Sequence, residues 1–115
     1  MIKMKKIEAI IRTSKFEEIH ECLLGLGVKF LAIYEVKGMG MEHPKAQTYR
    51  GIAYEPAYIP RTKIEVVVPE KLVEGVVDCI LTKGRTGQVG DGKIFIYEAL
   101  SAYRIRNNDT GEEAL

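Results

Sequence analysis

The 115-residue chain fits a single domain, residues 1–115, and its 46% hydrophobic and 29% charged residues exclude an intrinsically disordered protein. A formal net charge of +1 excludes a whole-protein field that would attract nucleic acid or a membrane surface, so any anion site must be local. No apolar run approaches the roughly 20 residues needed to cross a bilayer, and the N-terminus lacks a signal peptide's apolar segment, so we expect a cytoplasmic protein.

The first half of the chain predicts a strand, a helix and a second strand. Mixed alternation of apolar and charged residues predicts a strand over 4–12. Apolar residues at helical spacing then predict a helix over 16–24, with Ser14 and Glu17 at the spacing of a capping box. Residues 29–37 are rich in apolar and aromatic side chains, which predicts the second strand.

The second half repeats this order after a long segment. Residues 38–59 show no clear periodicity, and a loop of this length in a small domain is usually functional. Residues 61–68 predict a strand, and a clean apolar stripe over 72–81, just after Pro69, is the strongest helix signal of the chain. A fourth strand is expected over 93–99.

The two strand–helix–strand halves predict an α+β fold of the ferredoxin-like type, a double βαβ with a four-stranded antiparallel sheet and both helices on one face. The second and third strands are apolar at residues of both parities, so we expect both faces of the sheet to be buried. The sequence holds nothing to cover the second face, and a symmetric partner is the simplest candidate. We therefore expect an obligate oligomer.

Two further patterns concern the cysteines and the end of the chain. Cys22 and Cys79 lie inside apolar helical patterns without metal-ligand spacing, and we expect reduced core residues of an intracellular protein. Residues 102–106 are compatible with a short extra strand, and residues 107–115 read as a polar tail.

The segment 86–95 has the chemistry of a phosphate cradle. Glycine accepts positive φ and lets backbone N–H groups approach a bound group, and Lys93 adds a mobile positive charge. On these residues alone, an ordinary turn between a helix and a strand explains Gly90-Asp91-Gly92 better. The rest of the chain reverses that order.

Five segments, in order along the chain, carry a family resemblance. Two have the character of signatures: Tyr49-Arg50-Gly51-Ile52-Ala53-Tyr54 and Thr86-Gly87-Gln88-Val89-Gly90-Asp91-Gly92-Lys93-Ile94-Phe95. The flanking segments are residues 4–11, residues 60–69, and Arg104-Ile105-Arg106 with residues 110–113. Together they resemble the PII nitrogen-regulatory proteins, the GlnB and GlnK family, over essentially the whole chain.

The resemblance implies a homotrimer of ferredoxin-like subunits that binds ATP or ADP in clefts between neighbours and is not an enzyme. It makes residues 38–59 the T-loop, which reports the nucleotide state to an ammonium transporter or another nitrogen-metabolism protein. Contact with a membrane is then expected only through a transporter partner, and no nucleic-acid partner is expected.

The resemblance also assigns roles to single residues. Nucleotide-binding roles fall on Gly38, Gly40, Arg61, Glu65, Val67, Thr86, Gly90, Asp91, Gly92, Lys93, Arg104 and Arg106. Partner contacts fall on Tyr49, Arg50, Gly51 and Tyr54, and Tyr54 matches a tyrosine that some members have uridylylated.

Plainer interpretations of these residues stay open. Arg104 and Arg106 alternate as on a strand, where they either reach a neighbour's phosphates or solubilise an edge. Glu65 is expected either to contact the nucleotide or to make a buried salt bridge. Gly38 and Gly40 either lie beside the nucleotide or form a plain hinge of the long loop. Tyr54 is a modification site or an exposed loop residue.

The largest departure from the family lies at the start of the long loop. Met41 and Glu42 stand where the family commonly has an arginine and a glutamine. Glu42 can ligate Mg²⁺ together with the nucleotide, but its charge would repel dianionic 2-oxoglutarate. His43 beside it adds only a second candidate ligand, which does not make a metal site, and Ala32 replaces a hydroxyl residue that usually meets adenine. We therefore expect ATP or ADP to bind without 2-oxoglutarate.

Three alternatives differ in function. A divergent paralogue would respond to adenine nucleotides and regulate another transporter or nitrogenase. A small metabolic enzyme is disfavoured because His20 and His43 have no adjacent nucleophile or carboxylate pair at catalytic spacing. An RNA-binding module is disfavoured because the chain lacks a basic face with paired aromatics.

Overall fold

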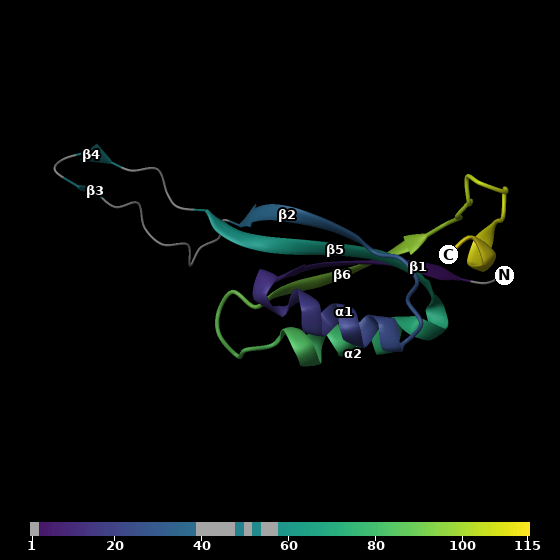
Figure 1. Cartoon of the computed structure of the whole chain (residues 1–115), viewed down its shortest axis with the longest axis horizontal. Coiled ribbons are helices and arrows are strands. Elements are labelled where there is room, and N and C mark those ends of the chain that lie inside the picture. Colours follow the sequence, from purple (N-terminus) through teal and green to yellow (C-terminus); the bar gives the residue numbers. More distant parts are fainter. Residues whose placement is uncertain (1–2, 39–47, 50–51, 54–57) are drawn as a thin grey trace.

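Two strand–helix–strand units build the protein, as the computed structural model shows (Figure 1). The structure describes residues 3–38, 48–49, 52–53 and 58–115. Its elements are β1 (Met4–Ile11), η1 (Thr13–Lys15), α1 (Phe16–Gly25), β2 (Ala32–Gly38), β3 (Thr48–Tyr49), β4 (Ile52–Ala53), β5 (Ile59–Pro69), α2 (Glu70–Gly84), β6 (Gly92–Ala99) and η2 (Gly111–Ala114).

The main sheet has the strand order β2-β5-β1-β6, and every neighbouring pair is antiparallel. Both helices pack on one face of this sheet (Figure 1). The predicted ferredoxin-like double βαβ is therefore confirmed. The second strand begins three residues later than predicted, at Ala32, and the third extends two residues further in the N-terminal direction, to Ile59.

Alternation along the central strands decides which side chains form the core. Ile7, Ala9 and Ile11 of β1 and Ile64, Val66 and Val68 of β5 point toward the helices and are buried. They pack against Ile19 and Leu23 of α1 and against Val76 and Ile80 of α2, the apolar stripes that the helical spacing predicts.

The opposite face of the sheet, which we call the open face, carries no helix among the residues that the structure describes. It carries Phe95 and Tyr97 on β6 and Tyr34 on β2, whose exposed fractions are 44%, 47% and 44%. Burial of this face by a symmetric partner stays a prediction, because a partner and not the chain itself is expected to cover it. The α-helices of the described residues, α1 and α2, both pack on the other face.

The first helix starts differently from the prediction. Ser14 lies in the 3-10 turn η1, α1 begins at Phe16, and Lys15 at the N-cap position makes no side-chain capping hydrogen bond. The predicted capping box of Ser14 and Glu17 is therefore wrong, because Ser14 is already wound into a turn. The second helix begins directly after Pro69, as the sequence indicates.

A disulfide joins Cys22 of α1 to Cys79 of α2, with the two Cα atoms 5.9 Å apart. The prediction that both cysteines are reduced is wrong, although their place among core side chains is confirmed. The two positions are separated by 57 residues, so the pairing depends on helix packing that sequence spacing does not reveal.

The end of the chain folds back on itself. Residues 102–106 do not form a strand: Tyr103 makes an isolated bridge to Thr110, and Asn108 has a positive φ of 63°. We call residues 102–115 the C-terminal hairpin. It ends in η2 and makes the expected polar tail an ordered segment of the structure.

The predicted T-loop, residues 38–59, is described only in part. Thr48 pairs with Ala53 and Tyr49 pairs with Ile52, so β3 and β4 form a separate two-stranded sheet. Gly40, Met41, Glu42, His43, Arg50, Gly51 and Tyr54 lie outside the described residues. No helix of the described chain combines the length and the hydropathy that a membrane span requires.

Candidate functional site

Residues 86–92, which we call the glycine loop, connect α2 to β6 through a backbone that only glycine accepts easily. Gly87, Gly90 and Gly92 have φ values of 86°, 100° and 106°. A Cβ at Gly92 would overlap the carbonyl oxygen of Ile10 on the neighbouring strand β1. The glycines therefore allow both the turn and its close approach to the sheet.

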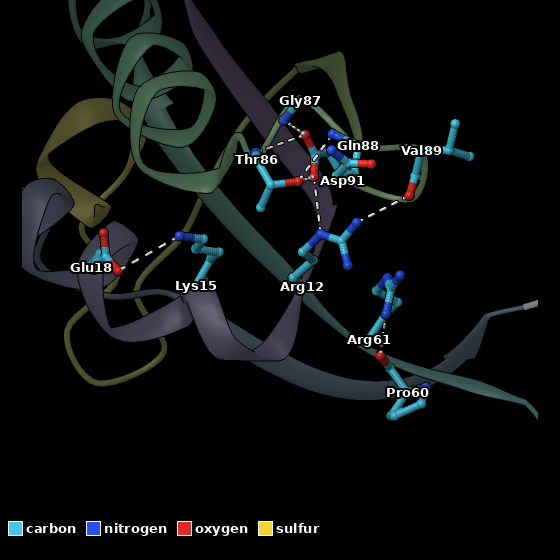
Figure 2. A network of polar contacts seen from close by, with 10 residues as sticks. All are labelled: Arg12, Lys15, Glu18, Pro60, Arg61, Thr86, Gly87, Gln88, Val89 and Asp91. Carbon is cyan, nitrogen blue, oxygen red and sulfur yellow. Dashed lines mark hydrogen bonds and ion pairs between the residues drawn. The ribbon is translucent and has the colours of Figure 1, made fainter.

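The carboxylate of Asp91 holds the glycine loop together from inside. Its Oδ2 accepts hydrogen bonds from the backbone N–H groups of Thr86 and Gly87, both at 2.8 Å. Its Oδ1 accepts hydrogen bonds from the Thr86 hydroxyl and, at 2.9 Å, from Arg12 Nε. Part of the predicted anion cradle is thus filled by the protein's own carboxylate (Figure 2).

Two arginines from other strands flank this loop. Arg12 follows β1, and its Nη2 donates a hydrogen bond to the carbonyl oxygen of Val89 at 3.0 Å. Arg61 of β5 donates from Nη1 to the carbonyl oxygen of Pro60, and its Nη2 lies 3.0 Å from the position of a Cβ at Gly90. Figure 2 shows both guanidinium groups beside the loop.

These contacts stabilise the charged form of Asp91. The Thr86 hydroxyl, the Arg12 guanidinium and the Thr86 amide hold the pKa of Asp91 far below its usual range. The carboxylate therefore stays ionised at any physiological pH and keeps its hold on the loop.

A cavity of about 680 Å³, which we call the β5 cavity, collects a second group of predicted residues. Glu65 and Val67 of β5 line it together with Arg104 of the C-terminal hairpin. Ala32 of β2, directly opposite Glu65 in the sheet, also lines it.

Arg104 does not extend freely into the β5 cavity. Its Nη1 pairs with Asp109 Oδ2 at 3.3 Å, and its Nη2 donates a hydrogen bond to the carbonyl oxygen of Glu113 at 3.0 Å. The hairpin is also joined to α2 by an ion pair of Lys71 and Glu112, again at 3.3 Å. Arg106 lies in the turn of the hairpin and is exposed, so the predicted strand alternation of the two arginines is wrong.

The structure divides the predicted residues between these two places. Arg61, Thr86, Gly90, Asp91 and Gly92 meet at the glycine loop, and Lys93 follows directly, exposed on β6. Gly38, the last residue of β2, lies beside Arg61 and pairs with Ile59 at the base of the long loop. Tyr49 belongs to β3.

Sequence reasoning missed Arg12. The residue ends an ordinary strand pattern, and its partner Asp91 is 79 positions away in the chain. Its one visible signal is a cation directly after an apolar strand end.

Among the residues described, no group of three or more His, Cys, Asp or Glu side chains is arranged to hold a metal ion. Glu42, the one proposed contact to Mg²⁺, lies outside them.

A family model described as "Nitrogen regulatory protein P-II" matches residues 4–109. The nitrogen regulatory protein P-II of Cereibacter sphaeroides is 46% identical over 112 residues, covering 97% of this chain and 100% of the relative. Nitrogen regulatory protein P-II 1 of Escherichia coli K12 is 42% identical over 110 residues, which cover 96% of this chain and 96% of the relative. These names describe regulatory proteins, which confirms the expectation of a regulator rather than an enzyme.

Solved structures agree with these relatives. The structure of B. subtilis GlnK superposes with a TM-score of 0.81 at 36% identity, covering 98% of this chain and 99% of that one. The crystal structure of Arabidopsis thaliana PII bound to citrate also superposes with a TM-score of 0.81, at 30% identity, covering 98% of this chain and 92% of that one. Fold, motifs and sequence therefore agree: the chain belongs to the nitrogen regulatory protein P-II family.

Proposed function

We propose that this P-II protein acts in the cytoplasm as a homotrimer that binds ATP or ADP in the clefts between its subunits. Residues 38–59 then contact an ammonium transporter or a nitrogen-metabolism enzyme according to the nucleotide bound. The observation that carries this proposal is the distance between two groups of cations that are both expected to bind the nucleotide's phosphates.

The two groups lie at opposite ends of one sheet. The glycine loop enters β6 at Gly92, which pairs with Ile11, the last residue of β1. The C-terminal hairpin follows Ala99, which pairs with Met4, the first residue of β1. Figure 1 shows the loop and the hairpin at the two ends of the sheet. β1 has 8 residues, which corresponds to about 25 Å.

This separation favours a site shared between chains. Lys93 follows the loop at one end of β1, whereas Arg104 belongs to the hairpin that follows the other end. The loop of one subunit would then face the β5 cavity of a neighbour. The exposed aromatic side chains of the open face support the same arrangement, because such side chains are typical of an interface.

The base of the long loop lies close to the cations that we expect to bind a phosphate. A Cβ at Gly38 would lie 3.6 Å from Arg61 Cγ, and Arg61 borders Gly90. A phosphate that draws the Arg61 guanidinium would therefore act on the segment where residues 38–59 leave the sheet. We propose that this contact links the nucleotide to the long loop. The nucleotide would shift the populations of two loop conformations, which requires it to bind the two conformations with different affinities.

Light scattering combined with calorimetry tests the proposal. We expect the mass of three chains, one nucleotide bound per chain, and weaker binding of AMP than of ATP or ADP because fewer phosphates meet the cations. Added 2-oxoglutarate should leave the ATP affinity unchanged, with or without Mg²⁺, because Glu42 would repel it. The variant Lys83→Gln, which removes the charge of an exposed lysine in the last turn of α2, serves as the control and should bind the nucleotides as the unmodified protein does.

A monomer that binds none of the three nucleotides would refute the proposal. A trimer that binds 2-oxoglutarate tightly would leave the nucleotide site standing and refute only the assignment based on Glu42.

A further inference from the structure

Arg12 contacts the glycine loop on both sides of Gly90. Its Nε donates to Asp91 Oδ1 at 2.9 Å, after Gly90, and its Nη2 donates to the Val89 carbonyl oxygen at 3.0 Å, before Gly90. The same Nη2 lies 3.4 Å from the position of a Cβ at Gly90. A single planar guanidinium group therefore contacts both neighbours of Gly90, and Figure 2 shows these contacts to Val89 and Asp91.

The hold of Arg12 extends to the start of the loop through Asp91. The carboxylate that Arg12 contacts also accepts hydrogen bonds from the N–H groups of Thr86 and Gly87. Arg12 is anchored at the end of β1, where the preceding residue, Ile11, pairs with Gly92. The loop is thus joined to the sheet at its first, middle and last residues.

We propose that Arg12 is a positioning residue for nucleotide binding, a proposal that rests on the function proposed above. It acts through Asp91 and Val89 and does not contact the nucleotide itself. By ordering the glycine loop before the ligand arrives, it removes an ordering cost that binding would otherwise carry. Lysine cannot replace it, because one ammonium group lacks the planar fork that makes both contacts.

The affinity of ATP for three variants tests this role. We expect Arg12→Gln to weaken ATP binding about tenfold, the order expected for losing charged hydrogen bonds. Arg12→Lys should stay several-fold weaker than the unmodified protein. Lys15→Gln is the matched control: Lys15 lies three positions further along, contacts Glu18 at 4.0 Å, and should leave the affinity unchanged.

A double variant separates positioning from a general loss of charge. If Arg12 acts through Asp91, then Arg12→Gln combined with Asp91→Asn should lose no more affinity than the larger of the two single losses. Fully additive losses would contradict the proposal. Wild-type affinity in Arg12→Lys would contradict it as well, because charge alone would then suffice.

The nucleotide-free protein gives a second, independent measurement. In Arg12→Gln, we expect the amide resonances of Gly87 and Gly90 to shift or broaden and the pKa of Asp91 to rise. If the unmodified protein binds no adenine nucleotide, the proposed function fails while these resonances still report on Arg12. Unchanged loop resonances in Arg12→Gln would overturn the positioning role.

Discussion

At the residue scale, the glycine loop is a turn whose shape is fixed by one carboxylate. Asp91 closes the turn by accepting the amides of Thr86 and Gly87. The same contacts fix the loop beside the two guanidinium groups of Arg12 and Arg61. The turn interpretation of Gly90-Asp91-Gly92 is therefore confirmed, and its role as an anion cradle stays a prediction.

The ionised state of Asp91 makes the stability of the protein depend on pH. Because its pKa in the folded chain lies below the unfolded value of about 3.9, the ionised carboxylate stabilises the fold above that pH, and this stabilisation is lost as the pH falls. We expect the difference in Tm between the unmodified protein and Asp91→Asn to narrow as the pH drops below about 4.

Thermal unfolding of the two proteins between pH 7 and pH 3 measures this difference. Glu98→Gln is the control for removing an ionised carboxylate elsewhere in the fold, since Lys5 lowers the pKa of Glu98 at a place far from the loop. A difference in Tm that stays constant with pH would show that the contacts of Asp91 do not depend on its charge.

The places of single residues in the fold could be predicted only where the residues lie within a motif. The glycines, Asp91 and Lys93 stand together in the sequence, so their meeting in one loop could be expected. Arg12 could not be found in this way, because strand pairing alone brings it to Asp91. The contact of Arg104 with Asp109 was missed for a different reason: a turn with positive φ at Asn108 replaces the expected strand.

At the scale of elements, strong periodicity predicted the helices and strands well. The apolar stripe of α2 and the alternation in β5 locate those elements to within two or three residues. The start of α1 and the C-terminal hairpin were predicted less well, because both depend on single hydrogen bonds in short turns rather than on a repeated pattern. Burial of the open face could not be judged from one chain.

The disulfide between α1 and α2 carries a prediction about stability. A link between residues 57 positions apart reduces the conformational entropy of the unfolded chain, which stabilises the fold by about 4 kcal/mol in the loop-closure model. We expect a reductant, or the double substitution Cys22→Ala and Cys79→Ala, to lower the free energy of unfolding by roughly this amount.

Denaturant unfolding with and without reductant, at one fixed protein concentration, measures the effect. The double variant serves as the control, since its stability should not respond to reductant. If the unmodified protein is equally stable in both conditions, the bond either stays closed to the reductant or does not stabilise the fold, and a thiol assay of the same samples separates these outcomes.

At the scale of the whole molecule, the fold and the family were predictable, while the places where the fold puts the predicted nucleotide-binding residues were not. The order of strands and helices determines the ferredoxin-like sheet, and motifs in the same order along the chain indicate the P-II family. The resemblance places the glycine loop and Arg104 near one nucleotide. The structure adds that one chain holds them at opposite ends of β1.

The most direct test of a site shared between subunits uses mixed trimers of two defective variants. Lys93→Glu damages the glycine-loop half-site, and Arg104→Gln damages the β5 cavity, so neither variant alone should bind ATP. In a trimer that contains both, one cleft joins an intact loop to an intact cavity, and we predict that ATP binding returns at that cleft. If the mixed trimers bind no ATP although the unmodified protein does, the nucleotide site lies within a single chain and the account is wrong.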